Sequence, residues 1–395
     1  MLKEFLVSEL KPGMFVADVT EQTGRFSVKS GGFVRSQKSI DNLSAKGVSK
    51  VLVDLDKSEH EKEPEVAPVS TAVPVEKVRP KTSFKDEIGK AKKLYNQAKT
   101  LQRQALKNMK AGRPIDTGGM KEVADGFIDS IFRNQDALAC MTRMRQKDDY
   151  LMEHSINVSI IMTIFAKHLQ IDEKTIHDLA TGALLHDLGK INIPDEVLHK
   201  PGRLTDDEMV IMRSHVTLGY DILRESSDLS PTILEVVRDH HERLDGSGYP
   251  NGKNENELSQ FAKMISICDT YDAITASRVY QNARTPIMAF KILRKESGTG
   301  FDANLVAEFI NCMGVHPVGT LIQTKSNKLG IVIKSNFVNP LCPVVKVFYS
   351  LANKGYIPSK TIDLGAPGVE DEIAQSVKPE DYGIDINRIM TEILD

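Results

Sequence analysis

The sequence lacks the features that mark membrane, secreted and nucleic-acid-binding proteins. Its longest apolar stretch, VSIIMTIFAKHL, is interrupted by Lys167 and His168 and is too short to span a bilayer. The N-terminus MLKEFLVSEL has neither the basic start nor the apolar run of a signal peptide. A formal net charge of −3 gives no sign of a polyanion-binding surface. We therefore expect a cytoplasmic protein with no membrane span and no nucleic-acid polymer as partner.

Cysteine is scarce and scattered. The four cysteines, Cys140, Cys268, Cys312 and Cys342, form no close pair, which excludes the spacing of a disulfide framework or a zinc knuckle. The content of 41% hydrophobic and 27% charged residues is instead typical of a globular chain. A length of 395 residues is enough for two or three domains.

The chain divides into segments of different character. Residues 1–60 predict a small α+β domain, in which the strand-like runs KPGMFVADV and VSKVLVDL lie on either side of a short helix, SIDNLSAKG. Residues 61–83 are rich in proline and have no periodicity, which indicates a linker. Residues 84–315 predict helices, residues 316–365 contain short β-rich runs, and residues 366–395 form an acidic tail with an amphipathic end. We expect a mainly α multidomain chain, whose all-helical core lies between a small N-terminal α+β domain and a small C-terminal β subdomain.

Within the helical part, the first segment, FKDEIGKAKKLYNQAKTLQRQALKNMKAG, is long and basic. Such charge runs usually form a helix face exposed to water. The alternative interpretation of this segment is an electrostatic arm or a dimer-forming helix. Thr205 and Glu208 have the spacing of a capping box and mark a helix start. Further helices are expected near 118–140, 148–169, 173–188, 206–225, 230–241, 258–276, 286–297 and 302–312.

Histidines and carboxylates recur together on the apolar faces of these helices. His186 shares a face with Leu179 and Ala183, and Asp269 shares one with Ile265. A lone histidine on such a face is usually a hydrogen-bonded core residue. A buried aspartate without a partner, however, costs several kcal/mol. Several histidines beside two aspartates compensate one another best around divalent cations.

Seven candidate ligands are more than one ion needs, but they fit two ions if Asp187 bridges them. The seven are His154, His186, Asp187, His215, His240, His241 and Asp269, and His177 is a more doubtful addition. His240 and His241 point about 100° apart on a helix. They can still converge on one ion at a helix end, where the chain turns into the loop DGSGYP.

Three stretches resemble the HD-GYP branch of the HD phosphohydrolase superfamily: HDLGKINIPDEVLHKPGRLTDDE, HHERLDGSGYP and CDTYDAITASRVY. The resemblance covers roughly 145–315. The N-terminal domain resembles one of unassigned role that is often found ahead of such modules in bacteria. HD-GYP proteins are bacterial phosphodiesterases that hydrolyse cyclic dinucleotides, chiefly cyclic di-GMP. The resemblance therefore implies a hydrolase of second-messenger signal transduction.

The resemblance also implies the roles of the ligands. His154, His186, Asp187 and Asp269 would hold one metal ion, and Asp187 would bridge to a second ion held by His215, His240 and His241. Such a dinuclear site suits iron or manganese. A hydroxide bridging the two ions would open cyclic di-GMP to linear pGpG, and cleavage to GMP could follow.

Three further residues are expected to contact the substrate. Lys190, just past the helix stop at Gly189, would reach the scissile phosphate. Arg278 would do likewise if its helix ends near Ser277. Tyr249 is a candidate contact for the substrate or for a protein partner at the Gly-Tyr-Pro loop, and a plain turn is the alternative.

Two positions depart from the family pattern. Some members complete a third metal site with a glutamate where this chain has Tyr150, while Glu153 and Asp149 lie off the His154 face. We therefore expect two ions. Gln281 replaces a lysine that many members carry, so a preference for 3′,3′-cyclic GMP-AMP is an alternative.

Other function classes stay open. An HD-type nucleotide hydrolase is disfavoured by His215 and the His240–His241 pair. A catalytically weak cyclic-dinucleotide receptor would be favoured by a lost ligand, and none of the seven is lost. The oligomeric state is also open, and a homodimer is one alternative.

Overall fold

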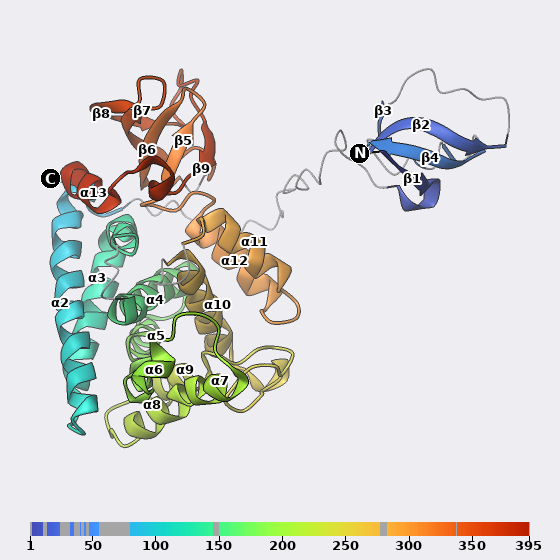
Figure 1. Ribbon diagram of the computed structural model, residues 1–395. Helices are drawn as coiled ribbons and strands as arrows, with labels where there is room; N and C mark the ends of the chain where they lie inside the picture. Colours follow the sequence, from blue (N-terminus) through green and yellow to red (C-terminus); the bar gives the residue numbers. More distant parts are fainter. Residues whose placement is uncertain are drawn as a thin grey trace. The chain divides into compact units, whose positions relative to one another are not determined.

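The computed structural model describes residues 2–10, 14–23, 32–34, 40, 43–44, 47–54, 80–144, 150–276, 283–336 and 338–394, and the structural statements below refer to these residues. The chain forms two compact units, Met1–Val78 and Arg79–Asp395 (Figure 1). Most of the linker expected at 61–83 lies outside the described residues.

The first unit contains an antiparallel sheet of four strands in the order β1-β4-β2-β3. Its elements are β1 (Leu2–Leu6), η1 (Val7–Glu9), β2 (Phe15–Gln22), β3 (Gly32–Phe33) and β4 (Val48–Asp54). The central strand β4 places Val51 and Val53 in a small hydrophobic core. β1 was not expected from the sequence, and most of the expected short helix lies outside the described residues.

The second unit begins with helices. They are α2 (Phe84–Lys110), α3 (Thr117–Met141), α4 (Tyr150–His168), α5 (Glu173–Leu185), η3 (Leu188–Asn192), α6 (Asp195–Leu198), α7 (Asp206–Arg213), α8 (His215–Leu223), α9 (Pro231–Asp239), η4 (Glu255–Glu257), α10 (Gln260–Thr275), α11 (Pro286–Lys295) and α12 (Ala303–Met313). The predicted capping box at the start of α7 is confirmed, because the Thr205 hydroxyl accepts from the Glu208 N–H and Glu208 accepts from the Thr205 N–H.

Three helices differ from their expected form. The helix expected at 206–225 is divided at Ser214 into α7 and α8. The helix expected at 173–188 ends at Leu185, where the chain turns into η3. α3 is interrupted at Asn134, whose side-chain amide donates to the Thr82 carbonyl, 3.0 Å away.

Helix α4 is the centre of the helical part. It packs against α2, α3, α5, α10 and α12, and its buried face includes Ile156, Ile160 and Phe165. Because α4, α5 and α10 carry ligand candidates, the protein core fixes their relative positions.

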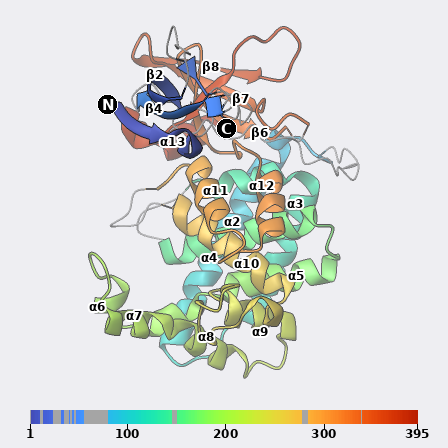
Figure 2. The same cartoon turned by 90° about the vertical axis from the view of Figure 1, so that its right-hand side faces the viewer.

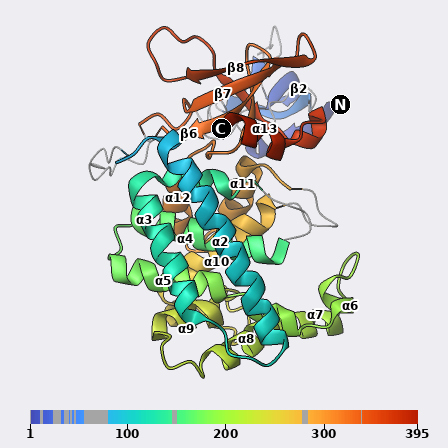
Figure 3. The ribbon, with the colours of Figure 1, turned by 90° about the vertical axis from the view of Figure 1, so that its left-hand side faces the viewer.

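A five-stranded antiparallel sheet follows, in the order β8-β7-β6-β5-β9. Its strands are β5 (Leu321–Thr324), β6 (Lys328–Lys334), β7 (Val344–Ser350), β8 (Gly355–Asp363) and β9 (Ile373–Ser376), followed by η5 (Pro379–Tyr382) and α13 (Ile386–Leu394). β9 lies beyond residue 365, so part of the segment expected as a tail joins this sheet. The sheet lies at one end of the helical part and α8 and α9 at the other (Figures 2 and 3). In the described part of the chain no helix is both long and apolar enough to cross a membrane.

Candidate metal centre

The seven candidate ligands come from five helices or helix ends. α4 carries His154, the turn between α5 and η3 carries His186 and Asp187, α8 begins with His215, α9 is followed by His240 and His241, and α10 carries Asp269. Gly189 permits this arrangement, because a Cβ there would lie 2.0 Å from the His215 carbonyl oxygen. Only glycine lets η3 approach α8 so closely.

The structure brings all seven residues together in two groups. One group is Asp187, His215, His240 and His241, and the other is His154, His186 and Asp269; within each group the candidate ligand atoms lie within 4.8 Å of one another. Asp187 Oδ1 lies 3.3 Å from His215 Nε2 and 3.8 Å from His240 Nε2. Its Oδ2 lies 3.5 Å from the Nε2 atoms of both His154 and His186. The carboxylate thus presents one oxygen to each group, as a bridging ligand must.

Hydrogen bonds at Nδ1 orient four of the imidazole rings. Three of them donate from Nδ1 to the carbonyl three residues earlier: His186 to Ala183 at 2.7 Å, His215 to Met212 at 2.7 Å and His240 to Val237 at 2.8 Å. His154 Nδ1 lies 2.8 Å from Asp272 Oδ2. Such contacts fix the ring tautomer and direct Nε2 to the centre, as they do around bound metals.

The atoms directed to the centre are buried and unsatisfied. Within the described part of the chain, His186 Nε2, His215 Nε2, His240 Nε2 and Asp187 Oδ1 have no hydrogen-bond partner. Leaving one buried polar atom unpaired costs about 1–3 kcal/mol, so four in one cluster require a common partner. Divalent cations fit the nitrogen and carboxylate donors present here.

The charges also suit a metal centre. Burial lowers the pKa of His186 and His240 and lowers that of His241 to about 3, so these rings are neutral. Burial would raise the pKa of Asp187 and Asp269, but the charge of Lys190 beside Asp187 and the hydrogen bond from His154 to Asp269 hold both pKa values well below the ordinary value. Neutral imidazoles and ionised carboxylates are the forms that bind metals.

His154 differs from the other rings. Burial lowers its pKa, but hydrogen bonds to Asp269 and Asp272 outweigh burial and raise it to about 9. Both ring nitrogens carry a hydrogen in the protonated form, and Nε2 lies 2.9 Å from Asp269 Oδ1. A divalent cation and a proton therefore compete for the same atom.

The structure assigns other contacts to residues near this set. Asp272, not singled out as functional from the sequence, holds His154; its signal was its position on the Asp269 face, three residues on. The doubtful candidate His177 instead lies 3.4 Å from Asp125 and 3.5 Å from Asp178. Glu153 forms an ion pair with Lys99 of α2, 2.9 Å away.

The predicted substrate contacts have different positions. Lys190 Nζ lies 2.5 Å from Asp187 Oδ2, at the centre. The Tyr249 ring lies 4.6 Å from the His241 ring between centroids, and the Arg213 guanidinium lies 5.0 Å over Tyr249. Arg278, Gln281, Ser277 and Asp149 lie outside the described residues, and so does the side chain of Tyr150; α10 ends at Thr275, as a role for Arg278 requires.

The loop after His241 folds back onto the end of α9. Glu242 accepts hydrogen bonds from the backbone N–H groups of Asn251 at 2.7 Å and Lys253 at 3.0 Å. A Cβ on Gly248 would lie 2.4 Å from the Arg243 nitrogen, so the glycine is needed for this close approach. The loop thereby holds Tyr249 beside His241.

Comparisons with known proteins agree with this geometry. An HD domain model matches residues 133–305, and a Domain of unknown function (DUF3391) model matches residues 2–119. A cyclic di-GMP phosphodiesterase of Pseudomonas aeruginosa is 32% identical over 381 residues, which cover 94% of this chain and 91% of that protein. This chain belongs to the HD-GYP family. The expected fold class and phosphodiesterase class are thereby confirmed.

Two further likenesses are more distant. The Vibrio cholerae protein named 3′3′-cGAMP-specific phosphodiesterase 3 is 32% identical over 171 residues, covering 43% of this HD-GYP chain and 37% of that protein. A solved structure of an HDG"Y"P protein from Bdellovibrio bacteriovorus has a TM-score of 0.49 and 16% identity, covering 78% of this chain and 98% of that one.

Proposed function

We propose that this HD-GYP enzyme uses a dinuclear centre to hydrolyse cyclic di-GMP to linear pGpG. The observation that carries the proposal is the position of Asp187, whose two oxygens face two separate groups of imidazoles. The full-length relative from Pseudomonas aeruginosa is named a cyclic di-GMP phosphodiesterase, which supports this substrate.

The residues have distinct roles in this proposal. His154, His186 and Asp269 would hold one cation, His215, His240 and His241 would hold the other, and Asp187 would contribute to both sites. Bound there, two divalent cations would activate a water molecule and offset negative charge on the phosphoryl oxygens. Lys190 adds a fixed positive charge beside the phosphate as negative charge accumulates in the transition state. We assign Arg278 and Tyr249 to substrate binding on the basis of the family resemblance.

Iron and manganese are the proposed metals, because a histidine-rich set with bridging carboxylate suits both. Metal analysis after anaerobic purification should find two ions per chain. At most one ion bound to the second unit would contradict the dinuclear model. A reproducible third ion would contradict the inference drawn from Tyr150.

The second candidate substrate is 3′,3′-cyclic GMP-AMP. It is favoured by Gln281, which replaces a family lysine, and by the relative named for this substrate. A neutral amide can donate a hydrogen bond to phosphate but adds no Coulomb attraction. Discrimination would then depend more on the bases.

Competition between the two rings tests the choice. Both should be offered to one metal-loaded preparation and kcat/KM compared, with linear products identified by mass. A higher kcat/KM for cyclic di-GMP supports the first candidate, and the reverse supports the second. Turnover of mononucleotides with neither ring cleaved would identify a general HD nucleotide hydrolase instead.

A further inference from the structure

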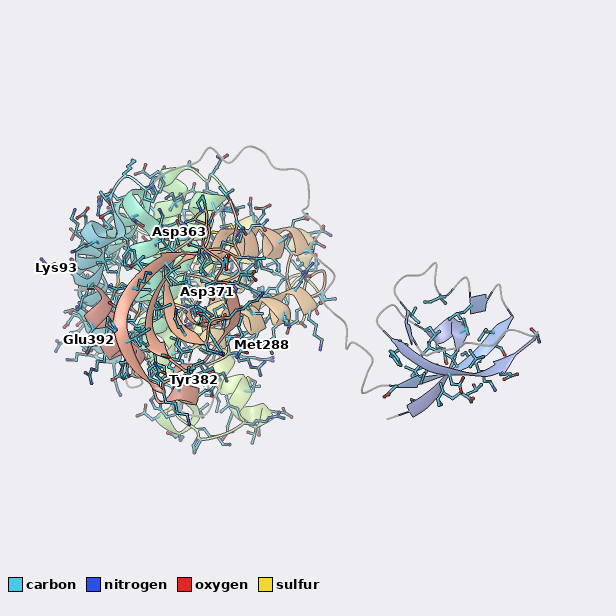
Figure 4. The ribbon with its side chains drawn as sticks, turned by 90° about the horizontal axis from the view of Figure 1, so that it is seen from above. Lys93, Met288, Asp363, Asp371, Tyr382 and Glu392 are labelled. Carbon is cyan, nitrogen blue, oxygen red and sulfur yellow. The ribbon has the colours of Figure 1, made fainter. Side chains whose placement is uncertain are left out.

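Helix α2 turns one face to the helices that carry metal ligands. Its buried positions recur every three or four residues: Ile88, Ala91, Tyr95, Ala98, Gln102, Ala105 and Met109. Charged residues such as Lys93 face outward (Figure 4). The basic segment is therefore a core helix with one solvated side. Polar groups on its buried side need partners, since burying them unpaired is costly.

Two of these polar partners lie on α4, on either side of His154. Tyr95 Oη donates a hydrogen bond to Asn157 Oδ1, 2.8 Å away, and both side chains are buried. Lys99 Nζ donates to Glu153 Oε1 at 2.9 Å, in a pair whose side chains are only 13% and 2% exposed. Glu153 directly precedes His154, and Asn157 follows it by three residues. α2 thus holds the turn of α4 that presents the first ligand.

The third polar partner lies at the end of α5. Gln102 Nε2 donates to the Leu184 carbonyl oxygen. The last carbonyls of a helix have no partner within the helix, so this amide satisfies one of them. His186 and Asp187 follow immediately. The end of α5 is therefore fixed by α2 just before it delivers two ligands.

Apolar contacts extend this arrangement. Ala105 and Met109 of α2 share a hydrophobic cluster with Leu185 and Leu188, which directly flank His186 and Asp187. One helix face thus contacts the chain on both sides of the bridging carboxylate.

We propose that α2 is a positioning element of the dinuclear centre, with Tyr95, Lys99 and Gln102 setting the spacing between His154 and the His186–Asp187 pair. The proposal rests on the proposed dinuclear site. α2 falls within the DUF3391 match at 2–119 and before the HD domain match at 133–305. The DUF3391 match therefore includes the helix that contacts the residues next to the candidate ligands.

The test measures Mn²⁺ affinity by chelator competition, together with melting temperature, kcat and KM, in the full chain. Tyr95→Phe, Lys99→Met and Gln102→Leu each remove the hydrogen bond described above for that side chain. Substituting a residue that directly orients a metal ligand typically changes metal affinity about 10–100-fold. The three α2 residues contact neighbours of the ligands instead, so we expect each substitution to lower Mn²⁺ affinity about three- to tenfold. kcat should fall with the affinity, while KM changes little.

The matched control is Glu87→Gln on the same helix. Glu87 is fully buried and pairs with Arg133 and Ser130 at 2.9 Å, on α3 rather than on a ligand helix. The Glu87→Gln substitution should lower the melting temperature without changing Mn²⁺ affinity. Lys99→Arg keeps the positive charge and should retain Mn²⁺ affinity. If Lys99→Met fails to fold, Lys99→Arg and Tyr95→Phe still test the proposal.

Two outcomes would overturn the proposal. In one, the three α2 variants have lower melting temperatures but bind Mn²⁺ with the same affinity as the parent protein. In the other, Glu87→Gln loses affinity as they do, so that any loosening of α2 has the same effect. Because Mn²⁺ affinity is measured without substrate, failure to cleave any cyclic dinucleotide would count against the proposed function alone.

Discussion

Asp187 is the residue on which the centre depends most. Its side chain is almost fully buried, and its oxygens face four imidazoles and Lys190. Burial opposes its charge, but these neighbours hold its pKa well below the ordinary value. The residue is therefore an anion whose surroundings are cationic or metal-binding.

Asp187→Ala should abolish hydrolysis and release metal, because it removes the carboxylate between two mutually repelling cations. Lys190→Ala should keep the metal but lower kcat by about ten- to a thousandfold, the range for one charge-stabilising group. Metal content and kcat measured on both variants separate the two roles. Normal turnover by Lys190→Ala would contradict the proposed contact between Lys190 and the phosphate.

Gly189→Ala should disrupt the centre without changing a ligand. The added Cβ would lie 2.0 Å from the His215 carbonyl oxygen and 2.6 Å from the Gly219 nitrogen, both backbone atoms. η3 and α8 must then separate, at a cost of about 1–3 kcal/mol, and His215 moves with α8. Melting temperature and Mn²⁺ content should both fall. Gly89→Ala, at an exposed helical site with open space, is the control and should stabilise α2 by about 0.5–1 kcal/mol.

At the scale of residues, all seven candidate ligands expected from the sequence lie together in the structure, whereas the residues that support them were not expected. His186 and Asp269 could be found because buried polar groups on apolar stripes are costly and therefore informative. Asp272 has the same spacing signal, but its contact with His154 joins α10 to α4 across 118 positions. Nothing local to either helix specifies that pairing.

At the scale of elements, helices were predictable where periodicity and caps agree, as at α7. The break in α3 was not, because Asn134 bonds to Thr82, 52 positions away. The division of 206–225 into α7 and α8 brings His215 to a helix start that periodicity does not mark. β9 joins its sheet through β5, and a four-residue strand in an acidic segment carries too little pattern to predict that partner.

The junction between α3 and the C-terminal sheet contains a buried acid. Asp136 is 4% exposed and accepts hydrogen bonds from Ser335, which follows β6, at 3.1 and 3.3 Å. Burial raises its pKa above 3.8, although the Ser335 hydrogen bonds and the charges of Lys334 and Lys167 act in the opposite direction. The folded state therefore holds this proton more tightly than the unfolded chain does.

Asp136→Asn should stabilise the second unit at neutral pH. Because the folded pKa is raised, wild-type stability falls as pH rises from about 4 through that pKa, and the whole penalty is present above it. Asparagine has no charge to bury and can still bond to Ser335. We expect a gain of about 1 kcal/mol at pH 7.5 that shrinks towards pH 4.5, measured by denaturant unfolding at both values. A gain that is equal at both would refute a role for the proton.

At the scale of the whole molecule, the seven candidate ligands all belong to one compact unit. The division at Val78 and Arg79 leaves the first unit with its own small core and none of the seven ligands. The DUF3391 match nevertheless extends to residue 119, across α2. The family boundary and the structural boundary thus differ by one helix, and that helix contacts the chain around the ligands.

Two truncations distinguish these boundaries. Deleting residues 1–78 should leave Mn²⁺ content and basal kcat largely intact, because Lys81 and Thr82 keep their hydrogen bonds to α3 and α2 keeps its contacts. Deleting residues 1–119 removes α2 and exposes the apolar surface that Ala105 and Met109 cover, so both metal content and the folded state should be lost. Metal analysis and thermal melts of the two proteins check this. Loss of folding in the shorter deletion would show that the first unit is required for the stability of the second.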